Sequence, residues 1–91
     1  MSLNNPTQAG LVNILNLLKC AEVSIGETTK DLQTQYQLLG IKPCDQLSTK
    51  LELVIEECST SMEETMQVIL AGESFIEHLI SMLEEYDKVE L

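Results

Sequence analysis

The stretch Gly40-Ile41-Lys42-Pro43 separates two long runs of regularly spaced apolar residues and decides the fold. Gly40 suits the left-handed conformation that follows a helix, Ile41 can pack back on the last turn, and Pro43 prevents the helix from continuing. Asp45 suits the N-cap of the next helix, and Ser48 is the competing candidate for that position. We therefore predict a turn at residues 40–45 with a long helix on either side.

Before this turn, residues recur on one seam every three or four positions, which is the spacing of one helical face. Asn4 and Thr7 can cap a helix start, and Pro6 is tolerated in a first turn. We predict a helix over residues 7–39. Its seam consists of Leu11, Leu15, Leu18, Ile25, Leu32, Tyr36 and Leu39, with Glu22 and Thr29 as polar members.

After the turn, the same spacing predicts a second helix over residues 46–88. Its seam consists of Leu51, Ile55, Cys58, Met62, Thr65, Ile69, Gly72, Ile76, Leu79, Leu83 and Tyr86. A glycine inside a helix costs about 1 kcal/mol relative to alanine, which a packed helix tolerates. We expect a continuous helix, while a break near Gly72 that creates a third helix stays open.

The fold class that follows is all-α: a single domain over residues 1–91, built as a long antiparallel helical hairpin. In this hairpin the second arm is longer than the first. Its apolar end, which includes Leu79, Ile80, Met82, Leu83, Tyr86 and Val89, would extend past the first helix without cover from the same chain. We therefore expect an oligomeric helix bundle. The alternative is a self-contained three-helix bundle.

The net charge of −10 limits the class of partner. Four acids and four lysines precede Glu52, whereas eleven acids and one lysine occupy the rest of the chain. Nucleic acids and anionic membrane surfaces attract clustered lysine or arginine, so both partners are disfavoured. We also expect no membrane span, because no unbroken apolar run approaches about 18 residues.

The chain offers little of the chemistry that catalysis or metal binding needs. Cys20, Cys44 and Cys58 are far apart and odd in number, which does not suit a disulfide framework but suits reduced thiols in the cytoplasm or nucleus. His78 is the one histidine, and no ligand cluster surrounds it in sequence. We predict no catalytic, cofactor-binding or metal-binding residues.

The sequence therefore indicates a non-enzymatic subunit that binds protein partners, as a homodimer or hetero-oligomer within a larger intracellular complex. Apolar residues at helical spacing are the expected partner interface: Leu11, Leu15, Leu18, Ile25, Leu32, Ile69, Ile76, Leu79, Ile80, Met82, Leu83 and Tyr86. The alternative is a self-contained acidic adaptor that binds a basic peptide or helix. A salt-sensitive interaction would favour the adaptor.

Overall fold

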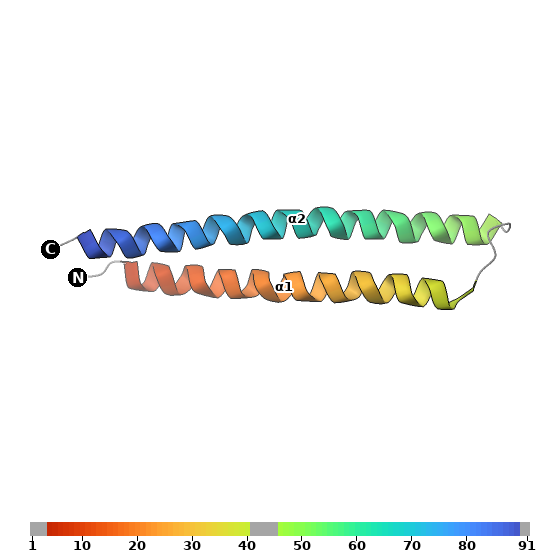
Figure 1. The fold of residues 1–91 in the computed structure, drawn as a ribbon, viewed down its shortest axis with the longest axis horizontal. Coiled ribbons are helices and arrows are strands. Elements are labelled where there is room, and N and C mark those ends of the chain that lie inside the picture. Colours follow the sequence, from red (N-terminus) through yellow and green to blue (C-terminus); the bar gives the residue numbers. More distant parts are fainter. Residues whose placement is uncertain (1–3, 41–45, 90–91) are drawn as a thin grey trace.

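The computed structural model describes residues 4–40 and 46–89, which form two long helices. Helix α1 (Asn4–Leu38) and helix α2 (Gln46–Val89) lie side by side and antiparallel, so that their outer ends meet at the same end of the molecule (Figure 1). The hairpin measures 72 × 16 × 13 Å. This confirms the predicted all-helical hairpin. Helix α2 continues through Gly72, so no third helix begins there.

Helix α1 ends in a tightened last turn. The Leu39 N–H donates to the Tyr36 carbonyl at 3.2 Å, and the Gly40 N–H donates to the Gln37 carbonyl at 3.2 Å. Gly40 has a φ of 61°, a left-handed conformation that costs a residue with a Cβ atom. The predicted role of Gly40 is therefore confirmed. The rest of the predicted turn, including Ile41, Pro43, Cys44 and Asp45, lies outside the described residues.

The residues of α1 that face α2 form a regular heptad pattern. Half-buried side chains recur in alternating steps of three and four at Gln8, Leu11, Leu15, Leu18, Glu22, Ile25, Thr29, Leu32 and Tyr36. In coiled-coil notation, Glu22 occupies an a position and Ile25 a d position. The polar members find local partners where the structure records them: the Thr29 hydroxyl donates to the Ile25 carbonyl at 2.8 Å.

Helix α2 presents a heptad seam with one irregular step. Its inward positions are Ser48, Leu51, Ile55, Ser59, Met62, Met66, Ile69, Glu73, Ile76, Ile80 and Leu83. Two successive steps of four, from Leu51 to Ser59, locally unwind the pairing. The predicted seam is wrong at Cys58, Thr65 and Tyr86, which are exposed.

The contact between the two helices is thin. Across residues 7–40 and 46–86, where burial is described, Ile69 is the one large apolar side chain that is buried, at 9% exposure. Leu79, Ile80 and Leu83 are half-buried. The expectation that these three lack cover from their own chain is therefore wrong, because the helices pair in a register that sets Lys19 beside Glu77 and so places residues 79–83 beside the first turns of α1.

Candidate interaction surface

The ion pair between Lys19 and Glu77 shows how each helix is rotated about its axis relative to the other helix. The Lys19 ammonium lies 3.6 Å from the Glu77 carboxylate. Each residue directly follows a d position of its own helix (Leu18 and Ile76), so both are e positions. The e positions of α1 and α2 therefore share one side of the hairpin. The g positions, which directly precede the a positions, share the other side.

The g side of the hairpin and its adjacent c positions carry no charge over the half near the chain ends. We call this surface the uncharged face. It consists of Gly10, Ile14, Leu17 and Ala21 from α1, and of Thr65, Val68, Gly72, Phe75, Leu79, Met82 and Tyr86 from α2. Leu17 is 69% exposed, Val68 72%, Phe75 61% and Tyr86 65%. Large apolar side chains of both helices are thus left open to water on one side.

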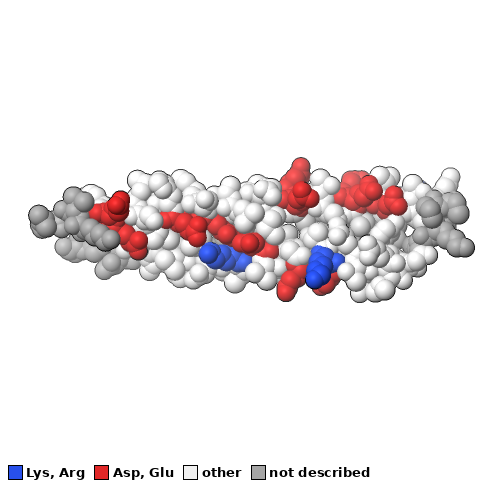
Figure 2. All heavy atoms as spheres, viewed as in Figure 1, with Lys and Arg blue, Asp and Glu red and all other residues white. Residues whose placement is uncertain are grey.

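The acidic residues of α2 lie away from this face. Glu63, Glu77 and Glu84 occupy e positions, and Glu57, Glu64 and Glu85 occupy the outward f positions. In Figure 2, acidic side chains are spread along the visible side of the hairpin and meet basic side chains near its middle. Charge and apolar surface are therefore separated around the hairpin, although exposed Val12, Val23 and Leu53 also lie outside the uncharged face.

Most of the predicted interface residues contact the other helix of their own chain. Leu11, Leu15, Leu18, Ile25, Leu32, Ile69, Ile76, Ile80 and Leu83 lie in the α1–α2 seam, buried or half-buried. Leu79 is half-buried at the edge of the uncharged face, while Met82 and Tyr86 are exposed on it. The predicted interface did not include Ile14, Leu17, Val68 and Phe75, which are large exposed side chains of that face. The signal was present, because Val68, Phe75 and Met82 recur every seven residues.

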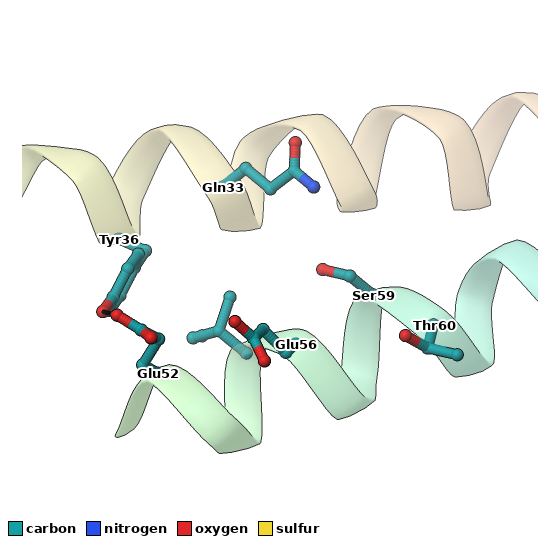
Figure 3. Close-up of a pocket in the computed structure, with 7 residues that line it drawn as sticks. Gln33, Tyr36, Glu52, Glu56, Ser59 and Thr60 are labelled. Atoms are coloured by element: carbon teal, nitrogen blue, oxygen red, sulfur yellow. Dashed lines mark hydrogen bonds between the residues drawn. The ribbon is translucent and has the colours of Figure 1, made fainter. Parts of the chain in front are cut away.

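A groove of about 590 Å³ opens between the helices in the half nearer the turn, and Figure 3 shows it. Its lining comprises Gln33, Tyr36, Glu52, Ile55, Glu56, Ser59 and Thr60. The Tyr36 hydroxyl donates to Glu52 Oε2 at 3.3 Å. Desolvation, followed by the charge and hydrogen bond of Glu52, raises the pKa of Tyr36 above its usual 10.0. This lining suits hydrogen bonds to a polar side chain and contains no histidine, cysteine or lysine.

Metal ligands do not gather anywhere in the described residues. No group of three or more histidine, cysteine, aspartate or glutamate side chains is placed there to hold an ion. Cys20 and Cys58 are free thiols on the exposed surface. His78 is also exposed.

Both helices pass a length-and-composition test for membrane spans. The segments Thr7–Leu38 and Gln46–Tyr86 contain 18-residue windows with mean hydropathies of 1.3 and 1.2. These windows pass although no unbroken apolar run approaches about 18 residues, because average hydropathy tolerates interspersed polar residues. The finding does not test the expectation of no membrane span, which stays a prediction. The windows are weak evidence, since core helices of water-soluble proteins pass the same test. A lysine or aspartate at the bilayer centre also costs about 2.5–3.5 kcal/mol.

No protein-family model, curated protein or solved structure matches this chain. The arrangement of its own residues is therefore the basis for a functional proposal.

Proposed function

We propose that this protein is a helical interaction subunit whose uncharged face packs against a second copy to form a four-helix bundle. The observation that carries this proposal is the segregation of surface types. Large apolar side chains from both helices share one side of the hairpin, and the exposed acidic residues of α2 in the same half of the hairpin occupy e and f positions away from it. Two apolar stripes on one helix are typical of a helix that packs against two neighbours.

The size of the face supports a stable contact. Ile14, Leu17, Val68, Phe75, Met82 and Tyr86 are between 48% and 72% exposed. Aromatic side chains have about 150–250 Å² each and the four aliphatic ones somewhat less, so at these exposures the six side chains together present on the order of 600 Å² of apolar surface. A standard interface buries about 800 Å² per partner, which this face approaches once its smaller residues are included. At about 25 cal/mol per Å², its burial competes with the cost of association.

The charge of the chain favours a second copy as the occupant. Two chains that each carry a net charge of −10 repel one another wherever their acidic surfaces approach. The uncharged face is a surface through which two identical chains can meet without opposing carboxylates. A strongly basic partner would instead gain most by covering the acidic residues.

The test is the solution mass measured by light scattering over a range of chain concentrations. We expect a mass twice that of the 10.2 kDa chain. Val68→Glu and Phe75→Glu should shift the protein to monomer while leaving it helical. Gln67→Glu adds the same charge at an exposed position next to Val68 but outside the uncharged face, and should leave the dimer intact. A fully helical wild-type monomer at every concentration would refute homotypic packing.

An acidic adaptor for a basic peptide is the second candidate. Lys19–Glu77 is the one side-chain ion pair recorded among the described residues, so most surface carboxylates there carry no salt bridge. Binding of a lysine-rich helical peptide that weakens strongly with added salt would support the adaptor. Self-association that is insensitive to salt would support the bundle. Free Cys20 and Cys58 fit a reducing compartment for either role.

A further inference from the structure

Two glutamates face each other across the seam between α1 and α2. Glu22 occupies an a position of α1 and is half-buried, and Glu73 occupies an a position of α2 and is 8% exposed. The Glu73 Oε2 atom is buried and has no hydrogen-bond partner in the described structure. A buried carboxylate without a partner is costly, whereas a protonated carboxyl group can donate to a neighbouring carboxylate.

We propose that Glu22 and Glu73 form a proton-binding site that makes the folding stability of the hairpin depend on pH. The ligand is one proton, held on Glu73 and directed to the Glu22 carboxylate across the seam. Both residues belong to one chain, and each faces the other helix of that chain. The inference therefore does not depend on self-association.

The surrounding charges favour this protonation on balance. Desolvation by burial raises the pKa of Glu73 most, and the nearby Glu22 carboxylate raises it further, as a hydrogen-bond acceptor for the protonated form and by its negative charge. Lys19 of α1 acts in the opposite direction and lowers the pKa, while Glu77 of α2 raises it. Lys19 is itself paired with Glu77 at 3.6 Å. The net direction is upward from the ordinary value of 4.5.

The sign of the stability effect follows from this direction. The folded chain retains the proton at a pH where the unfolded chain has already released it. The stability that this site contributes to the hairpin is therefore fully present below the ordinary glutamate pKa of 4.5 and is lost as the pH rises through the raised pKa. Across this window the folding equilibrium constant changes by up to about tenfold per pH unit, the limit for one proton.

The experiment is urea unfolding, followed by far-UV circular dichroism, at several pH values from about 7.5 down to about 4.5 and at one chain concentration. Glu73→Gln removes the titrating group but keeps the hydrogen-bonding capacity and the shape of the side chain. We expect this variant to be more stable than wild type at neutral pH and to lose most of the pH slope. Glu22→Gln should also stabilise the hairpin at neutral pH, with a non-additive effect in the double variant.

Glu64→Gln is the matched control, because it removes the same charge from an exposed f position. It should keep the wild-type slope, which separates the paired site from the general effect of a net charge of −10. Equal slopes for wild type and Glu73→Gln would overturn the proposal. So would an additive double variant.

Discussion

Val68 and Ile69 are neighbours on α2, and substitutions at these two positions test both the seam and the uncharged face. Ile69 is 9% exposed in the seam, and Val68 is 72% exposed on the uncharged face. Truncating a buried isoleucine to alanine costs about 2–5 kcal/mol. Because most of the seam around Ile69 is only half-buried, we expect Ile69→Ala to cost about 2–3 kcal/mol, at the low end of that range.

The sign of the effect at Val68 depends on whether a partner covers this position. If the face stays open, Val68→Ala stabilises the helix by about 0.5 kcal/mol, because alanine is the better helix former. If a second copy covers it, the loss of buried methyl groups at about 0.8 kcal/mol each exceeds that gain. The proposed bundle therefore predicts a net destabilisation of about 1 kcal/mol.

The assay is urea unfolding of wild type, Val68→Ala, Ile69→Ala and Gln67→Ala at two chain concentrations. Gln67→Ala controls for helix propensity, since Gln67 is exposed outside the uncharged face. For a dimer, the midpoint rises with chain concentration. Stabilisation by Val68→Ala under conditions where the wild type is dimeric would refute the assigned face. A cost below about 1 kcal/mol for Ile69→Ala would refute the seam.

Four further outcomes follow from the structure. In thermal unfolding, Gly26→Ala should stabilise the hairpin by about 0.5–1 kcal/mol, because alanine is the better helix former and the new Cβ would lie at an ordinary 3.9 Å from the Met66 Cε atom. Gly40→Ala should destabilise it by about 1 kcal/mol, because the φ of Gly40 is +61°. Glu52→Gln should lower the pKa of Tyr36 in a spectrophotometric titration in the Tyr86→Phe background, and an unchanged pKa would contradict the contact. The protein should be fully helical in buffer without lipid, and helicity that appears only with phosphatidylcholine vesicles would instead favour membrane insertion.

The sequence was sufficient to predict the two-helix hairpin because its signals are local. Gly40 and Pro43 stop a helix by their own backbone preferences, and spacing of three and four residues needs no knowledge of a partner. The expected and observed bounds of the first helix, 7–39 and Asn4–Leu38, differ by a few residues at its start. Such differences are ordinary at frayed helix ends.

The rotation of α2 was harder to predict because two stripes compete on it. Cys58, Thr65 and Leu79 belong to a regular heptad, and Ser59, Met66 and Ile80 belong to another that is displaced by one residue. One residue turns a helix by about 100°, so either stripe can face α1 when both are apolar. Glu73 interrupts the observed stripe with a charged residue, which weakens the apolar pattern of that stripe in the sequence. The pairing with Glu22 that we propose, which depends on the opposite helix, would account for its position.

The extent of the uncharged face indicates where along the hairpin a partner would bind. On α1 the uncharged face extends from Gly10 to Ala21, and the next c and g positions beyond it are the polar residues Ser24 and Thr28. On α2 its apolar part extends from Val68 to Tyr86, a rise of about 27 Å at 1.5 Å per residue. The hairpin is 72 Å long, so the proposed contact would occupy the half near the chain ends. A partner that contacts only this half would leave the groove lined by Tyr36 and Glu52 free for a separate polar contact.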